Sequence, residues 1–294
     1  MQQKTFGVIA VLLAAMMWAI EPVIAKLSYN QSDFLQTSMI RAFVISVFSL
    51  LLVLIARKPL IQKDKQKLKA LTYLALFGTL GADLIYYYAM TSIPVVNAVI
   101  LAHIQPVFII LIGFFILKKE SLHTFEYLGV LILMISAMLV TSQTIERIVQ
   151  LNFGTIGDAM VLLATITWAT TALTTRKYLT QIDASVITFY RFSLASLFFL
   201  FLVPFVNLTI NIYQITVGLV VGIGTISYYA GLKRLKAAQV SGIELAAPVF
   251  AAAIGYFVLQ ENITPLQILG MFMLFIGIYC ISRKQTIGLL KRPS

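Results

Sequence analysis

Ten stretches of about 20 apolar residues follow one another along this chain of 294 residues, and short polar connectors separate them. A bilayer core is about 30 Å thick, and a helix needs roughly 20 apolar residues to cross it. Apolar residues make up 60% of the chain, charged residues 11%, and the mean hydropathy is +0.93. These values are typical of an all-α integral membrane protein. We expect ten transmembrane helices, at residues 6–26, 36–56, 70–91, 94–117, 123–142, 154–176, 184–206, 213–232, 237–259 and 264–282.

The basic residues are distributed unevenly once these ten spans are drawn. Eighteen of the 22 Lys and Arg residues fall on the side of the N-terminus, and only Lys26 and Arg147 fall on the other side. The remaining two, Arg41 and Arg191, lie inside expected spans. Cytoplasmic loops carry the excess of basic residues in membrane proteins. We therefore expect both termini to be cytoplasmic in a multi-pass protein of a prokaryotic cell (inner) membrane. The formal charge of +11 then reflects topology and contact with the lipid bilayer, and no nucleic acid partner is predicted.

The two halves of the chain repeat one pattern. At an offset of 150 residues Trp18 aligns with Trp168 and Arg41 with Arg191, and at 142 Pro106 aligns with Pro248. Each half holds five expected spans, an odd number, so the second half enters the membrane from the opposite side. Inverted repeats of this kind are typical of secondary transporters, whose sites lie near the midplane. The expected domains are a first repeat (1–142), an external linker (143–153), a second repeat (154–282) and a basic cytoplasmic tail (283–294).

Several further motifs recur in order along the two halves. The first expected helix contains W-x-x-x-P-x-x-x-K, the second an early Arg, the third Y-Y-A and the fourth P-V-F, followed by Glu120 or Glu261 and a glycine in the fifth helix. Together they resemble the EamA domain pair of the drug/metabolite transporter superfamily, over residues 7–282. The resemblance implies ten helices in two inverted five-helix repeats. It also implies a central cavity, lined mainly by helices 1, 3, 4, 6, 8 and 9, that moves small metabolites or drugs by alternating access.

Charged side chains inside the expected spans mark candidate functional positions. An ionised residue at a helix centre costs about 2.5 to 3.5 kcal/mol on insertion scales, so such residues usually face a wet interior. Thr79, Asp83, Tyr86 and Tyr87 share one helical face and predict a polar, aromatic cavity lining. Asp83 could hold a cationic substrate group or a coupling proton, or it could form a fixed ion pair with Arg41. Both interpretations stay open at this point.

The first expected helix combines a carboxylate, a proline and an aromatic ring. Pro22 frees a backbone carbonyl inside the helix, and kinked segments are where transporter sites are built. Trp18 and Glu21 can share a face, an arrangement that suits an amine or a quaternary cation. The candidate substrate-binding residues are Trp18, Glu21, Asp83, Tyr86, Tyr87, His103, Thr171, Tyr228 and Glu244, and the candidate gating or structural residues are Arg41, Arg191, Pro22, Pro106 and Pro248.

The repeat symmetry separates structural from selective positions. Arg41 and Arg191 occur in both halves, on helices that run in opposite directions, so we expect one guanidinium near each side of the midplane. Substrate identity is expected where the symmetry fails, at Glu21 opposite Thr171 and at Asp83 opposite Gly224. In the fifth and tenth spans the small residues Gly129, Ser136, Gly270 and Gly277 predict close helix packing.

Other function classes find little support in the residues. Two histidines and one cysteine, far apart in sequence, provide no metal-binding motif, and no phosphate-binding loop is present. We therefore predict no enzyme, no metal and no cofactor, and a gradient as the energy source. The prediction is a secondary transporter for small organic solutes such as amino acids or amphipathic amines, acting in export, with a facilitative pore as the alternative. A proton or a counter-substrate would provide coupling, and a monomer or a homodimer are both compatible with the sequence.

Overall fold

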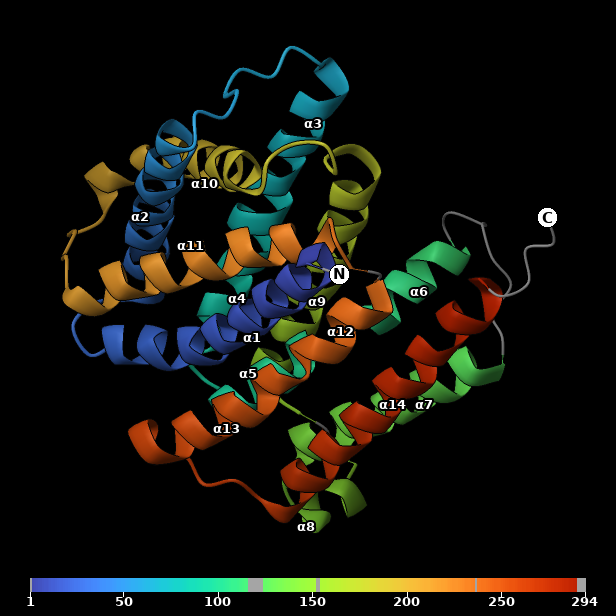
Figure 1. Ribbon diagram of the computed structural model, residues 1–294. Coiled ribbons are helices and arrows are strands. Elements are labelled where there is room, and N and C mark those ends of the chain that lie inside the picture. Colours follow the sequence, from blue (N-terminus) through green and yellow to red (C-terminus); the bar gives the residue numbers. More distant parts are fainter. Residues whose placement is uncertain (1, 116–123, 152–153, 236, 290–294) are drawn as a thin grey trace.

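The structure is entirely helical in its described part. The computed structural model describes residues 2–115, 124–151, 154–235 and 237–289 (Figure 1). Seven helices in this part are long and apolar enough to cross a bilayer, and three further apolar helices are shorter, at Tyr127–Ser142, Ala184–Leu200 and Pro265–Ile281. Glu120, one of the two acids of the repeated motif, lies outside the described residues.

The elements follow one another with short connections. They are α1 (Gln2–Ser28), α2 (Phe34–Ile55), α3 (Lys65–Tyr73), the π-helix η1 (Leu74–Asp83), α4 (Leu84–Ala89), α5 (Val95–Ala102), α6 (Gln105–Phe115), α7 (Thr124–Ser142), α8 (Ile145–Val149), α9 (Ile156–Tyr178), α10 (Ala184–Leu200), the short 3₁₀ turn η2 (Val203–Phe205), α11 (Ile212–Leu232), α12 (Ala237–Glu244), α13 (Ala246–Leu259) and α14 (Pro265–Leu289). Helix α14 thus continues into the segment that the sequence predicts as a basic tail.

Local sequence explains where the main helices begin. Asp33 and Asp183 occupy equivalent N-cap positions, before α2 and α10, and each side chain accepts a backbone N–H of the first turn. Thr155 and Asp158 form a reciprocal capping box at the start of α9. Caps of this kind satisfy N–H groups that have no partner inside the helix. The repeat is therefore visible in the capping residues as well as in the apolar spans.

Two of the expected spans are broken, at equivalent places in the two halves. The span at 94–117 divides between α5 and α6 around His103, and the span at 237–259 divides between α12 and α13 at Leu245. Pro106 and Pro248 follow these breaks by three residues. Proline lacks an N–H and clashes with the preceding turn, which favours an interruption just before it. Helix α1, in contrast, continues through Pro22.

The third expected span changes its winding before it reaches Asp83. Residues Leu74–Asp83 form a π-helix, which then continues as the α-helix α4. Such segments are rare and often lie at functional sites. The wider turn alters the spacing that the sequence predicts for Thr79 and Asp83, because four residues no longer complete one turn.

Helices from the two halves pack against one another throughout the bundle. In Figure 1, α1 runs beside α11, and α7 and α14 form a pair on one side of the molecule. Helix α2 packs against α10, and η1 against α9. The pair α7 and α14 meets at small residues, since a Cβ atom on Gly277 would lie 2.6 Å from Leu133 and Ser136 Oγ donates to the Gly270 carbonyl at 2.6 Å. These positions therefore pack as the sequence predicts.

Candidate functional site

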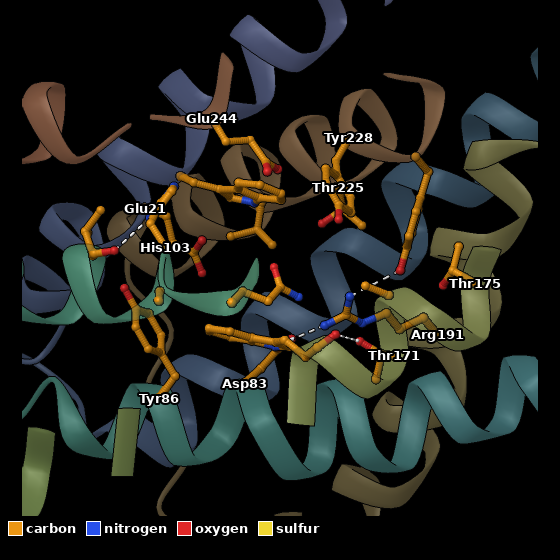
Figure 2. Close-up of a pocket in the computed structure, with 18 of the residues that line it drawn as sticks. Glu21, Asp83, Tyr86, His103, Thr171, Thr175, Arg191, Thr225, Tyr228 and Glu244 are labelled. Carbon is orange, nitrogen blue, oxygen red and sulfur yellow. Dashed lines mark hydrogen bonds and ion pairs between the residues drawn. The ribbon is translucent and has the colours of Figure 1, made fainter. Parts of the chain in front are cut away.

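A cavity lies where the two halves meet, and residues from both of them form its walls. It encloses about 1050 Å³ between its walls, part of it open to the exterior. Figure 2 shows Glu21, Asp83, Arg191, Tyr228 and Glu244 directed at this common space from different helices. The walls come from α1, η1 with α4, the break between α5 and α6, α9, α11 and α12, together with α2, α10 and α14. A concave site with a few convergent polar groups is the usual form of a small-molecule site.

Asp83 is the centre of a charge cluster at the floor of this cavity. Its Oδ2 atom lies 3.0 Å from Arg41 Nη2, and its Oδ1 atom lies 2.8 Å from Arg191 Nη2. Trp168 Nε1 donates to the same Oδ1 at 2.8 Å. Asp83 is 4% exposed and Arg41 is 2% exposed. Asp83 contacts both guanidinium groups, and Glu21, 3.5 Å from Arg41 Nη1, brings the second negative charge to the cluster. Two carboxylates therefore compensate two guanidinium groups in a buried environment.

The two arginines of the repeat share one partner, because both reach Asp83. Their expected places on opposite sides of the midplane stay a prediction. Helices α2 and α10 pack against each other, so two long side chains can converge on one acid. Phe192 separates them, with the Arg41 and Arg191 guanidinium carbons 5.7 Å and 5.1 Å from its ring centre. Asp83 therefore forms ion pairs with both arginines in this structure.

Arg191 has further partners beyond this carboxylate. Its Nε donates to Thr79 Oγ1 at 3.0 Å, and its Nη1 to the Tyr229 hydroxyl at 3.3 Å. Its guanidinium packs against the backbone of Gly78, which has no side chain. A Cβ atom at Gly78 would lie 3.3 Å from the guanidinium atoms of Arg191. Thr79 and Tyr229 thus hold this side chain from two helices, in a position where it also lines the cavity.

Glu21 lies beside the cluster and is held mainly by a tyrosine. The Tyr87 hydroxyl donates to Glu21 Oε1 at 2.8 Å, and Arg41 Nη1 is 3.5 Å from the same atom. The Arg41 guanidinium also stacks 4.3 Å from the Tyr87 ring centre. Tyr87 is fully buried, so it positions Glu21 and Arg41 instead of lining the cavity itself.

Glu244 differs from Asp83 and Glu21 in that no ion-pair partner of its carboxylate is found in the part of the chain that the structure describes. It lies at the end of α12, just before the helix break, and Figure 2 shows its side chain directed into the cavity. Within the described residues, no ion pair or hydrogen bond involves its carboxylate. His103 lines the cavity from the equivalent break between α5 and α6, and its Nδ1 bonds to the Val99 carbonyl at 2.7 Å. A carbonyl only accepts, so Nδ1 carries a proton.

Aromatic rings from the two halves form the remaining wall. The ring centres of Trp18 and Tyr228 are 5.0 Å apart, and those of Tyr86 and Trp168 are 5.2 Å apart. Each pair joins a tryptophan of one half to a tyrosine of the other. Electron-rich ring faces of this kind attract organic cations.

Most of the residues chosen from sequence meet in this cavity. Trp18, Glu21, Asp83, Tyr86, His103, Thr171, Tyr228 and Glu244 line it, as do Arg41, Arg191 and Pro106. Tyr87, Pro22 and Pro248 are absent from its lining. Sequence reasoning did not select five further lining residues, Trp168, Gln105, Thr175, Thr225 and Tyr229. The Y-Y-A segment of the second half contains Tyr229 beside Tyr228, so the repeat alignment could have pointed to it.

An ionic contact joins three helices at the end of α1 beyond Glu21. Lys26 Nζ lies 2.7 Å from Glu261 Oε1, and Glu261 Oε2 accepts the backbone N–H of Val95 at 2.8 Å. Below it, small apolar residues of α1, α5 and α13 pack closely, among them Ala19, Val99 and Ala251. The contact therefore connects α1, the start of α5 and the connection between α13 and α14. We call it the Lys26–Glu261 contact.

The chain is similar to a family of membrane transporters along most of its length. The model of the EamA-like transporter family matches residues 5–142 and 155–283. An uncharacterised transporter of Synechocystis sp. is 23% identical over 70% of this chain, and the match spans 63% of that relative's length. The uncharacterised transporter YoaV of Bacillus subtilis is 24% identical over 95% of this chain and 96% of its own length. Protein LicB of Haemophilus influenzae is 23% identical over 69% of this chain and 73% of its own length.

A solved structure shares the fold. The crystal structure of another protein superposes on this chain with a TM-score of 0.68 and a sequence identity of 16%. The superposition covers 98% of this chain and 99% of the other chain. The resemblance seen in the sequence motifs is confirmed by the family match, which covers both halves. The chain is a multi-pass membrane protein that belongs to the EamA-like transporter family.

Proposed function

We propose that this chain is a secondary transporter that moves small organic cations through the central cavity by alternating access. The observation that carries the proposal is the Glu244 carboxylate, which has no ion pair within the described residues and shares the cavity with the aromatic rings of Trp18 and Tyr228. Asp83 is already neutralised by its two arginines, so the acid left for a ligand is Glu244. A carboxylate next to ring faces favours a positively charged nitrogen over an anion. Amphipathic amines and amino acids carry such a group.

The broken helices support a transport cavity over a closed structural core. The breaks at His103 and Leu245 occur at the same place in the two halves, and His103 and Glu244 bring them to the cavity wall. Interrupted helices are tolerated in membranes where they line a cavity, and they build the substrate sites of several transporters. We extend this to the topology: ten spans cross the membrane as two inverted repeats, with both termini in the cytoplasm.

The residues at the two ends of the cavity support an opening toward the cytoplasm. Thr175 lines the cavity one residue before the basic pair Arg176-Lys177 that ends α9. Basic ends are expected on the cytoplasmic side. The Lys26–Glu261 contact lies at the opposite end of α1, where the packed helices close the bundle. We infer that this arrangement is the state open to the cytoplasm, which suits loading of a substrate for export, and that the Lys26–Glu261 contact belongs to the closed external gate.

Transport by purified protein in proteoliposomes tests the proposal. The probe is radiolabelled n-butyltrimethylammonium, exchanged against the same unlabelled cation inside the vesicles, with pentanoate as an anionic competitor. We expect saturable exchange that tetramethylammonium inhibits and pentanoate does not. Glu244→Gln should lower exchange about tenfold or more, because a charged contact to the ligand is lost. Glu146→Gln, the same change at an exposed acid of α8, is the matched control and should keep wild-type exchange.

The outcomes separate the alternatives. Inhibition by pentanoate, or equal exchange in wild type and Glu244→Gln, would reject a cation site at Glu244. Uptake that rises linearly with concentration and shows no exchange would instead support a facilitative pore. Both results are read from the same vesicles, so the substrate class and the mode of transport are tested independently.

A further inference from the structure

The two tryptophans of the repeat have different surroundings in the cavity. Trp168 directs its indole N–H at Asp83, with 2.8 Å between Nε1 and Oδ1. The aligned pair in the other half is Trp18 and Gly224. Asp83 aligns with Gly224 at an offset of 141 residues, the offset that also aligns the two Y-Y-A segments. The position that holds a carboxylate for one tryptophan therefore holds a hydrogen atom for the other.

Trp18 nevertheless lies against this glycine, as Trp168 lies against Asp83. A Cβ atom built on Gly224 would be 3.3 Å from Trp18 Nε1 and 3.5 Å from Trp18 Cδ1. It would also be 3.0 Å from the Cβ atom of Met17, so there is little room for a larger residue. The geometry of the tryptophan and its neighbouring helix is retained, but the acceptor is missing.

Two hydrogen-bonding groups are left over at this place. In the part of the chain that the structure describes, no acceptor is bonded to the Trp18 N–H, and Trp18 lines the cavity. The hydroxyl of Thr225, the residue after Gly224, also lines the cavity, and no hydrogen bond to it is found among the same residues. Figure 2 shows Thr225 and Tyr228 side by side on the cavity wall. Polar groups in apolar surroundings nearly always find a partner, so a ligand atom is expected there.

We propose that the Trp18 N–H and the Thr225 hydroxyl, over Gly224, form a subsite for an oxygen acceptor of the substrate. The inference rests on the proposed function, since it places the charged nitrogen of the same substrate near Glu244. The Trp18 ring stacks with Tyr228, and it provides both the aromatic wall and the donor. The substrate class is therefore an organic cation with an ether, carbonyl or hydroxyl oxygen a few bonds from its charged nitrogen.

Two isosteric probes isolate this contact. They are n-butyltrimethylammonium and (2-methoxyethyl)trimethylammonium, which differ only by one CH₂ group replaced by an ether oxygen. Affinities are measured by titration calorimetry on the purified full-length protein. Trp18→Phe keeps a ring and removes the N–H, and Trp168→Phe is the matched control, because that N–H is already used by Asp83.

We expect wild type to prefer the ether probe over the alkyl probe. Trp18→Phe should reduce this preference about three- to tenfold, the value of one neutral hydrogen bond, while Trp168→Phe leaves the preference unchanged. Gly224→Ala, which places a methyl group near Trp18 Nε1, should reduce the preference as well. Binding of the alkyl probe shows that each variant is folded.

Three results would overturn the inference. Equal affinities of wild type for the two probes, or an unchanged preference in Trp18→Phe, would reject the acceptor subsite while the cation site stands. An equal loss of preference in Trp168→Phe would assign the effect to the cavity as a whole and reject the role of Trp18. Binding of neither probe to wild type would reject the proposed function, and this inference with it.

Discussion

Asp83 and Glu244 are two acids of one cavity with opposite surroundings. Asp83 accepts from Arg41, Arg191 and Trp168, so both of its oxygens are occupied. Glu244 has no such partner among the described residues, although it lines the same space. A satisfied buried charge stabilises its surroundings, whereas an unpaired charge costs free energy that a ligand can recover. Under the proposed function, this difference predicts a structural role for Asp83 and a substrate contact for Glu244.

Removing the Asp83 charge should have the largest effect on stability. Asp83→Asn leaves two buried guanidinium groups with too little negative charge, and breaking such a network costs about 3 to 5 kcal/mol. Thermal unfolding in detergent micelles is followed by tryptophan fluorescence, which reports on the cavity because both tryptophans line it. The double variant Asp83→Asn with Arg191→Met, which removes one guanidinium, should regain part of the loss. A stable single variant would contradict the structural role of Asp83.

Gly78→Ala tests how tightly the same cluster is packed. The added methyl group would lie 3.3 Å from the Arg191 guanidinium, which must shift and loosen its contact with Asp83. We expect a loss of about 1 to 2 kcal/mol in the free energy of unfolding. Gly113→Ala, on α6, is the control, because a Cβ atom there would have no neighbour within 4 Å. Equal effects of the two changes would mean that Arg191 adapts freely.

Asp183, the N-cap residue of α10, is an acid outside the membrane-spanning segments whose carboxylate has hydrogen-bond partners. It can be compared with the two acids of the cavity. Burial acts to raise the pKa of Asp183, but the hydrogen bonds from Ser185 and the charge of Lys58 outweigh it and lower the pKa below its usual value. The stabilisation is therefore present above the pKa of the unfolded chain and is lost as the pH falls through the lower, folded value. Asp183→Ala should cost about 1 kcal/mol at neutral pH. Unfolding measured from pH 7 downward should show the two curves converging, and a constant difference would contradict this account.

Glu244→Gln should have the smallest effect on stability, and in the opposite direction. Neutralising an unpaired acid removes a desolvation cost, so the melting temperature should stay the same or rise by roughly 1 to 2 °C. The same variant is expected to lose exchange of the cation, which separates binding from folding. A clear drop in melting temperature would show that Glu244 has a stabilising partner and would weaken its assignment to the substrate.

The sequence predicts much of the cavity but little of its internal pairing. Trp18, Glu21, Asp83 and Glu244 could be found because charge and aromatic residues stand out inside apolar spans. Trp168 was aligned with Trp18 but was not selected as a binding residue. Its bond to Asp83 depends on how α9 meets η1, and no local pattern encodes that contact.

The arginines show the same limit. Their positions in the helices follow from the repeat, but helix direction alone does not predict that both side chains share Asp83. The side chains of Arg41 and Arg191 are long enough to reach across the contact between α2 and α10. Helix geometry places the backbone, whereas the reach of a side chain and the presence of a shared acid decide the pairing.

The sequence by itself determined the class of protein, the internal repeat and the set of charges that must be compensated, because the thickness of a bilayer and the cost of charge within it act on every span separately. The tertiary structure alone decided which charge compensates which. Pairing depends on distances between helices far apart in the chain, and through those distances Asp83 is satisfied and Trp18 faces a glycine where Trp168 faces an acid.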